Sequence, residues 1–218
     1  MEHIISGVAK FQKEVYPSKK AAFQKLANGQ NPEVLFFTCA DSRIDPNLVT
    51  QTEPGELFIC RNAGNIIPPH SNQTGGMTAS IEFAVAALGV SHIIICGHSD
   101  CGAMKGAINT EGLSSLPHVK EWLGHSRVAT EVVKEKCGCA ELNNNDHLGL
   151  VIEENVVQQL QHIKTHPAVA AKIATGQVKL HGWVYDIESA EIKTYDEATG
   201  SFKPVEDTDV ETLAKQSK

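Results

Sequence analysis

The sequence predicts an α/β fold in which a mainly parallel central β-sheet is flanked by helices. Two short runs, residues 34–37 and 92–96, are strongly apolar, rich in β-branched or aromatic residues, and followed by polar residues or glycine. Such runs are typical of strands buried on both faces. Stretches with helical spacing of apolar residues alternate with the strands, and this order favours parallel strands connected by helices.

Four strands and one hairpin partner are expected in the sheet. The last strand is followed by a run with the pattern of an antiparallel partner, which predicts a C-terminal antiparallel hairpin strand. The predicted strands are residues 34–38, 56–60, 92–96 and 179–185, with 191–195 as the hairpin partner.

The N-terminus predicts an N-terminal helical arm, residues 1–28. A first helix over 2–15 has its apolar residues at helical spacing, and a second is expected from Ser18, which can cap it, to Leu26. The apolar faces need a partner, either another subunit or the core of the same chain. Further helices are expected at about 77–88, 103–108, 122–136, 148–163 and 167–176.

The length predicts a single domain over residues 1–218, because 218 residues can enclose one ample core. Residues 110–147 are polar and predict an irregular insertion with one helix. Residues 196–218 are mixed in charge and poor in apolar residues, which predicts a loose tail.

Composition excludes several classes of partner. The net charge of −7 and the sequence pI of about 5.8 argue against nucleic acid and against a basic membrane surface. No secretory signal and no spanning segment are visible, so a cytoplasmic protein is expected. The six cysteines are then expected to be reduced thiols or metal ligands.

Two of these cysteines and one histidine predict a metal site. Cys39 follows one buried strand, and His98 and Cys101 follow another. The carboxyl ends of parallel strands meet at one edge of a sheet, where sites collect, and Cys and His are the donors that Zn²⁺ prefers. Three protein ligands leave a position for water, which is typical of a catalytic site. The candidates for a fourth ligand are Asp41, Asp100 and Cys60.

Asp41 and Arg43 stand two and four residues after Cys39, so an extended segment points all three to one side. One reading is a surface ion pair of about 0–1 kcal/mol. The functional reading is that Arg43 keeps Asp41 ionised and turned toward metal-bound water.

Together these motifs resemble the β-class carbonic anhydrases. The resemblance rests on Cys39-x-Asp41-x-Arg43, on the run 61–65 (RNAGN), on 97–102 (GHSDCG) and on 180–185 (LHGWVY). It covers roughly residues 25–195 and is weakest over 110–147.

The resemblance implies a zinc-dependent enzyme that hydrates carbon dioxide reversibly to bicarbonate and a proton. One Zn²⁺ per chain is then bound by Cys39, His98 and Cys101, and a zinc hydroxide, oriented by the catalytic dyad of Asp41 and Arg43, attacks carbon dioxide. A homodimer or a dimer of dimers is implied. Four positions match substrate-binding residues of the family: Gln30, Phe58, Ala63 and Gly102.

Two positions differ from residues found in some members of the family, and a third is a histidine considered as a proton relay. Phe36 replaces the tryptophan of a bicarbonate-inhibited subset, which argues against that non-catalytic site. Phe83 replaces a tyrosine of some relatives and removes one candidate proton relay. His70 titrates in a useful range but reads more simply as an exposed loop residue.

Alternatives stay open on the sequence alone. The same ligands serve hydrolases of carbon disulfide or carbonyl sulfide, and a non-enzymatic zinc or redox-sensing module would use Asp41 as a fourth ligand. No glycine-rich phosphate loop follows a strand, so a nucleotide binder ranks last. Cys60 and Cys96 read as packing residues. Cys137-Gly138-Cys139 could bind a metal or oxidise, but a Cys-x-Cys pair on a polar loop without nearby Cys or His partners is more often incidental.

Overall fold

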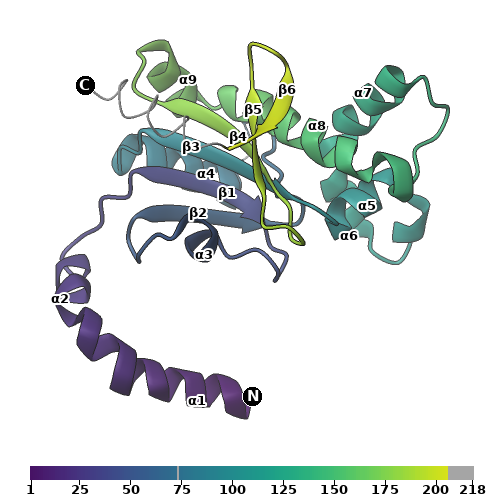
Figure 1. Ribbon diagram of the computed structural model, residues 1–218. Helices are drawn as coiled ribbons and strands as arrows, with labels where there is room; N and C mark the ends of the chain where they lie inside the picture. Colours follow the sequence, from purple (N-terminus) through teal and green to yellow (C-terminus); the bar gives the residue numbers. More distant parts are fainter. Residues whose placement is uncertain (73, 206–218) are drawn as a thin grey trace. The chain divides into compact units, whose positions relative to one another are not determined.

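The structure, a computed structural model, describes residues 1–72 and 74–205. The chain separates into two compact units, Met1–Asn31 and the part from Pro32 onward. The second unit contains a mixed, mostly parallel sheet flanked by helices, which confirms the predicted fold class (Figure 1). No described helix is both long enough and apolar enough to cross a bilayer.

The first unit is helical almost throughout. It contains α1 (Glu2–Lys10), a π-helical segment η1 (Phe11–Val15) and α2 (Tyr16–Leu26). Ser18 does not cap a second helix as expected, because its hydroxyl donates to the carbonyl of Val15 at 2.7 Å from within a continuing helix. Pro17 has no N–H to donate, and it lies in the first turn of α2, two residues after the wider π-helical segment ends at Val15.

The sheet has the order β2-β1-β3-β4-β5-β6. The first four strands in this order are parallel, and β5 and β6 are antiparallel to their neighbours. The strand bounds are β1 (Val34–Cys39), β2 (Leu57–Asn62), β3 (His92–His98), β4 (Lys179–Tyr185), β5 (Ile192–Asp196) and β6 (Ser201–Pro204). The five predicted strands are confirmed to within two residues.

The helices agree with the pattern except at residues 46–50, where no helix was expected, and between residues 110 and 147. The stretch predicted as one helix is divided into α6 (Pro117–Leu123) and α7 (Arg127–Cys137) by a 3₁₀ turn at Gly124–Ser126. The remaining helices are α3 (Pro46–Thr50), α4 (Gly76–Glu82) with its π-helical continuation η2 (Phe83–Ala87), α5 (Gly102–Ile108), α8 (Asn144–Lys164) and α9 (Pro167–Ala174), with a further 3₁₀ turn at Glu111–Leu113.

The main core lies between one face of the sheet and helices α4, α8 and α9 (Figure 1). Alternate strand residues point to opposite faces, so Leu35 and Phe37 enter this core while Phe36 lies in a smaller cluster on the other face. All three are fully buried. The apolar strands therefore fix the sheet firmly enough to hold side chains at the strand ends.

The C-terminal stretch differs in part from the expected loose tail. Residues 201–204 form β6, whose Phe202 packs on Tyr195 of β5 with ring centroids 5.3 Å apart. Residues 206–218 of the predicted tail lie outside the described residues. The division into a helical arm and a single domain stays a prediction.

A partly buried histidine pair between β3 and β4 predicts a pH dependence of stability. His92 Nδ1 lies 2.9 Å from His181 Nε2, and the rings stack. Burial, and then the nearby charges of His92 and Lys179, lower the pKa of His181 to about 4. Unfolding returns it to its ordinary value near 6.5, so the unfolded chain binds the extra proton.

The contribution of His181 to stability is therefore complete above about pH 6.5 and is lost as the pH falls toward about 4. We expect the free energy of unfolding, measured in urea, to fall between about pH 7 and 5 by about 2 kcal/mol more in the parent than in His181→Gln. His118→Gln, which changes an exposed histidine of α6, should behave as the parent. Equal pH slopes in parent and His181→Gln would refute this role.

Candidate metal centre

Cys39, His98 and Cys101 converge at the carboxyl-terminal edge of the parallel strands. Cys39 ends β1 and His98 ends β3, and these strands are hydrogen-bonded neighbours. Cys101 lies three residues after His98 and immediately precedes Gly102, the first residue of α5. The Cys39 and Cys101 sulfurs are 4.0 Å apart, and the two sulfurs and an imidazole nitrogen all lie within 4.8 Å of one another.

The side chains of all three residues are buried, with relative exposures of 5% for Cys39, 0% for His98 and 1% for Cys101. The Cys101 thiol holds the pKa of Cys39 down at about 4, against burial, with help from His98 and the Gly64 N–H. Hydrogen bonding to Cys39, and then burial, raise the pKa of Cys101. The sulfur pair thus carries one negative charge, which a cation between the sulfurs would balance.

His98 presents a lone pair to this pair of sulfurs. Its Nδ1 lies 2.8 Å from the carbonyl of Ser99, which only accepts, so Nδ1 carries the proton and Nε2 does not. Nε2 is fully buried and has no hydrogen-bond partner among the described residues. Burial lowers the pKa of His98, but contacts with Cys39, Ser99 and Asp41 outweigh it and raise the pKa. An orphaned nitrogen facing two sulfurs in a negative environment fits Zn²⁺.

Asp41 stands beside the three donors and is held by Arg43. The Arg43 Nε and Nη2 atoms donate to the two carboxylate oxygens at 2.9 and 2.8 Å, and the Arg43 backbone N–H donates to Oδ1 at 3.0 Å. Arg43 holds the pKa of Asp41 well below its usual range. Asp41 Oδ2 is 3.8 Å from His98 Nε2. A fixed, ionised carboxylate therefore borders the site.

Arg43 is itself oriented by a second carboxylate. Its Nη1 donates to Asp100 Oδ2 at 2.9 Å, and Nη2 donates to the Asp100 carbonyl at 3.2 Å. Asp100 has a left-handed backbone (φ 57°) and also pairs with Lys105 of α5. This chain of charges joins the segment after β1 to the segment after β3.

Arg61 of β2 fixes the backbone that carries Cys39 and Asp41. Its Nε donates to the Cys39 carbonyl at 3.0 Å, and its Nη2 donates to the carbonyls of Asp41 and Ile44 at 2.7 and 2.9 Å. A guanidinium suits this task because its donors diverge in a rigid fork.

Two amide side chains of α8 hold the loop after β2. Asn155 Nδ2 donates to the Gly64 carbonyl at 3.0 Å, and Gln159 Oε1 accepts from the Ile67 N–H at 2.8 Å. Gln159 also donates to Asn155 at 2.9 Å. The loop so placed directs the Gly64 N–H at the Cys39 sulfur, 3.4 Å away.

Comparison with known proteins identifies the family. The family model for carbonic anhydrases matches residues 34–192. The chain belongs to the β-carbonic anhydrase family.

Named relatives and solved structures agree with this assignment. A carbonic anhydrase of Pseudomonas aeruginosa is 46% identical, over 93% of this chain and 90% of that protein. Carbonic anhydrase 1 of Escherichia coli O157:H7 is also 46% identical, over 94% of this chain and 92% of that protein. The structure of the β-carbonic anhydrase CcaA superposes with a TM-score of 0.90 at 41% identity, covering 94% of this chain and 99% of the other.

The residues predicted to bind substrate lie at different places. Gln30 belongs to the N-terminal unit, so its prediction stays a prediction. Ala63 lies on the loop after β2, where its carbonyl accepts from Trp122 Nε1 at 2.9 Å, and Gly102 begins α5. Phe58 pairs with Leu35, four rows before Cys39, which is about 13 Å along the strand. Phe58 contacts Phe83 with ring centroids 6.1 Å apart.

The other residues considered from sequence have ordinary surroundings. Phe36 is buried against Trp183, Phe83 is about half exposed, and His70 stacks edge-on against His166. Burial raises the pKa of Cys60, and it raises the pKa of Cys96 to about 12. Cys60 and Cys96 are free buried thiols.

The supporting residues Asn155 and Gln159 were missed from sequence. A signal was present, because both are polar residues four apart on the otherwise apolar face of α8. Buried amide side chains need hydrogen-bond partners, so two of them on one helix face indicate that they hold a neighbouring segment.

The hydrogen bonds of Arg61 predict a role in metal affinity. Arg61→Lys keeps the positive charge but loses the fork that holds three carbonyls. We expect Zn²⁺ affinity, measured by competition with a chelating dye, to fall by about 10–100-fold. Arg127→Lys, at the exposed start of α7, is the matched control. Unchanged affinity in Arg61→Lys would show that the loop holds its position without the fork.

Proposed function

We propose that this protein catalyses the reversible hydration of carbon dioxide to bicarbonate and a proton, with one Zn²⁺ per chain held by Cys39, His98 and Cys101. The observation that carries the proposal is an open set of three buried donors beside a carboxylate that Arg43 holds through both of its oxygens. Three protein ligands are typical of a catalytic zinc site, whereas four are typical of a structural one. The carbonic anhydrases named above support the same activity.

Bound there, the metal would supply a Lewis acid that makes water nucleophilic at neutral pH. The chain supplies the surroundings. His98 is kept in one tautomer by the Ser99 carbonyl, and the Gly64 N–H stabilises the negative charge on Cys39. Cys39 and Cys101 would hold the metal as thiolates, which requires the remaining thiol proton to be lost.

Asp41 is the hydrogen-bond acceptor that orients the nucleophile. Arg43 keeps its carboxylate ionised, and a carboxylate can only accept hydrogen bonds. Asp41 Oδ2, the oxygen nearer to His98, is the atom that accepts from the attacking water. The hydrogen bonds from Arg43 turn the carboxylate so that it does not need to reorganise during the reaction.

Carbon dioxide is small and uncharged, which suits an apolar wall with few donors. We assign Ala63 to that wall. Phe58 is assigned to it by the resemblance alone, because it lies about 13 Å along the strands from the level of Cys39. Gln30 and the backbone N–H of Gly102 are assigned to the substrate oxygens. These four assignments rest on the family resemblance of the motifs.

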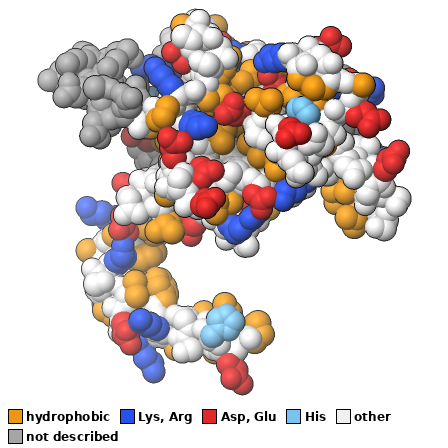
Figure 2. Space-filling view, turned by 45° about the vertical axis from the view of Figure 1, so that its right-hand side comes forward, with side chains coloured by type: hydrophobic (Ala, Val, Ile, Leu, Met, Phe, Trp, Pro, Cys, Tyr) orange, Lys and Arg blue, Asp and Glu red, His pale blue; other side chains and the backbone are white. Residues whose placement is uncertain are grey.

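We also propose a homodimer or a dimer of dimers in which the N-terminal helices contact a second copy of the chain. No residue of α1, η1 or α2 is buried. Large apolar side chains are exposed at helical spacing along the unit: Ile4, Ile5, Val8, Phe11 and Val15. Figure 2 shows hydrophobic side chains along this unit. A solved pair of related enzymes, from Sordaria macrospora, is described as tetrameric; one is 28% identical with a TM-score of 0.77 and covers 93% of this chain and 98% of the other.

The direct test is stopped-flow hydration of carbon dioxide with a pH indicator on zinc-loaded protein. We expect a rate that rises between about pH 6.5 and 9. The rate should fall by about 100-fold or more in Asp41→Asn, because a neutral amide accepts a hydrogen bond more weakly than the carboxylate and can turn an N–H donor toward the nucleophile. Asp196→Asn, in the β5–β6 hairpin, is the matched control with unchanged rate.

Two results would contradict parts of the proposal. No hydration by fully zinc-loaded parent protein would refute the activity and direct attention to carbon disulfide, carbonyl sulfide or a sensing role. Full activity in Asp41→Asn with unchanged zinc content would refute only the role of Asp41.

A further inference from the structure

A second cluster of sulfur and imidazole lies outside the metal centre. Cys137 is the last residue of α7, Cys139 follows two residues later, and His147 lies near the start of α8. The structure joins Cys137 and Cys139 by a disulfide. His147 Nε2 is 3.4 Å from the Cys139 sulfur. The sequence-based view that this pair has no histidine partner is therefore wrong, because the turn between α7 and α8 brings His147 back to it.

The turn that carries the two cysteines is held by backbone hydrogen bonds. Gly138 adopts a left-handed conformation (φ 66°), and its N–H donates to the Glu135 carbonyl at 3.3 Å. The Cys139 N–H donates to the Lys134 carbonyl at 3.1 Å. The two Cα atoms are 5.3 Å apart, within the range that a disulfide requires. Because backbone groups hold this geometry, the dithiol and the disulfide both fit the same turn.

The proton on His147 decides between a metal ligand and a thiolate partner. The Asn143 backbone N–H, which only donates, lies 3.1 Å from His147 Nδ1. Nδ1 therefore accepts, and the proton of the neutral ring sits on Nε2, which faces the Cys139 sulfur. An N–H in this place stabilises a thiolate at Cys139 and leaves no lone pair for a metal. The cluster is therefore suited to thiol chemistry rather than to metal binding.

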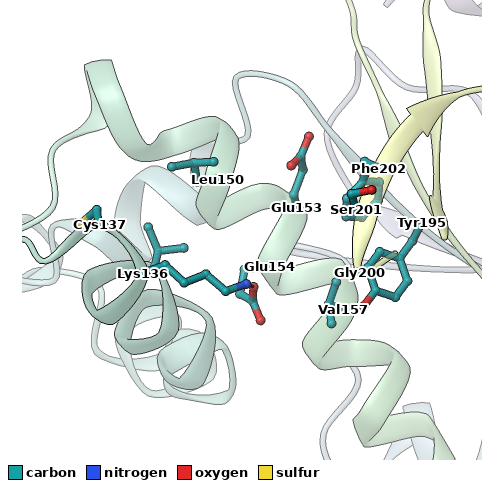
Figure 3. A pocket seen from close by; sticks show the side chains of 11 residues that line it. Lys136, Cys137, Leu150, Glu153, Glu154, Val157, Tyr195, Gly200, Ser201 and Phe202 are labelled. Atoms are coloured by element: carbon teal, nitrogen blue, oxygen red, sulfur yellow. Dashed lines mark hydrogen bonds and ion pairs between the residues drawn. The ribbon is translucent and has the colours of Figure 1, made fainter. Parts of the chain in front are cut away.

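Access also separates this pair from the other cysteines. Cys39, Cys60, Cys96 and Cys101 are buried, whereas Cys137 is exposed. Cys137 stands at the margin of a pocket of about 440 Å³ between the end of α7, α8 and the β5–β6 hairpin, as Figure 3 shows. A small molecule can therefore reach the Cys137 sulfur without opening the core.

The pocket wall beside Cys137 is charged. Lys136 pairs with Glu154 at 2.7 Å across the pocket, and Figure 3 shows the two side chains meeting between α7 and α8. The Lys136 ammonium extends away from Cys137 toward Glu154, so it leaves the approach to the Cys137 sulfur free.

We propose that Cys137 and Cys139 form a reversible dithiol–disulfide pair that exchanges with low-molecular-weight disulfides and thiols, with His147 as the positioning residue for the Cys139 thiolate. In the oxidising direction the Cys137 thiolate attacks a small disulfide, forms a mixed disulfide and releases one small thiolate. The Cys139 thiolate then attacks the Cys137 sulfur and releases the second. Two electrons pass from the pair to the small disulfide, and the two thiol protons end on the two small thiols released.

Reduction is the reverse of this sequence. A small thiolate attacks the exposed Cys137 sulfur, and Cys139 leaves as a thiolate. The His147 N–H stabilises this thiolate by donating a hydrogen bond to it. Exchange is faster when the leaving thiolate is stabilised, so the place of His147 suits the reductive step as well as the resting dithiol.

The test uses zinc-loaded protein, so that Cys39 and Cys101 stay bound, equilibrated in buffers of reduced and oxidised glutathione. Free thiols are then trapped by alkylation, and intact mass with peptide mapping locates them. We expect a two-electron change confined to Cys137 and Cys139. Cys139→Ser should stop at a glutathione adduct on Cys137, and Cys137→Ser should form adducts severalfold more slowly because the exposed sulfur is gone.

The role of His147 is tested by rate rather than by end point. His147→Leu should slow reduction by glutathione severalfold and shift its pH profile upward, whereas His147→Gln, which keeps an N–H donor, should restore part of the rate. His118→Leu is the matched control, since it removes an exposed histidine of α6. Equal rates and profiles for His147→Leu and parent would refute the positioning role.

Two results would overturn the pair itself. One is a dithiol that persists in fully oxidised glutathione buffer. The other is a second equivalent of Zn²⁺ that binds the reduced parent and is lost in Cys137→Ser, which would make the cluster a metal site.

Discussion

Parallel pairing of β1 with β3 is the constraint on which the site depends. The two strands end at the same edge of the sheet, so their last residues, Cys39 and His98, become neighbours. The strands are far apart in sequence, because the paired residues Thr38 and Cys96 are 58 positions apart. The apolar strand interiors supply the stability that permits this. Burying two sulfurs and an unpartnered imidazole nitrogen is unfavourable unless something pairs with them. A cation bound between Cys39, His98 and Cys101 would therefore stabilise the fold at the edge of the sheet where these donors meet.

Around the donors, charged and amide side chains act on backbone rather than on the site itself. Arg61 donates hydrogen bonds to three backbone carbonyls at the end of β1 and just after it. The amides of α8 hold the loop that places the Gly64 N–H against the Cys39 sulfur. Arg43 differs, since it acts directly on the Asp41 carboxylate. The donor set is thus positioned by hydrogen bonds from three different elements: the neighbouring strand, α8 and the segment after β3.

Much of this arrangement could be predicted from the sequence, because it is encoded locally. Short apolar runs followed by Cys39 and by His98 predict both the strands and the convergence of their ends. Features that depend on how neighbouring segments turn back and pack on one another could not be predicted. β6 has only four residues and no alternating pattern, and it exists through pairing with β5. The approach of His147 to Cys139 depends on the path of the turn between α7 and α8. Ser18 has the local signature of a cap, yet the helix continues through it.

The central claim is that two sulfurs and one imidazole hold a single zinc and leave one position open. X-ray absorption at the zinc edge, on protein loaded with one equivalent, tests this most directly. The account predicts two sulfur neighbours at about 2.3 Å, one nitrogen at about 2.0 Å and one further light atom, with the same spectrum in Asp41→Asn. A shell with three or more sulfurs, or with none, would contradict the donor set. Loss of the light atom in Asp41→Asn would show that Asp41 closes the site.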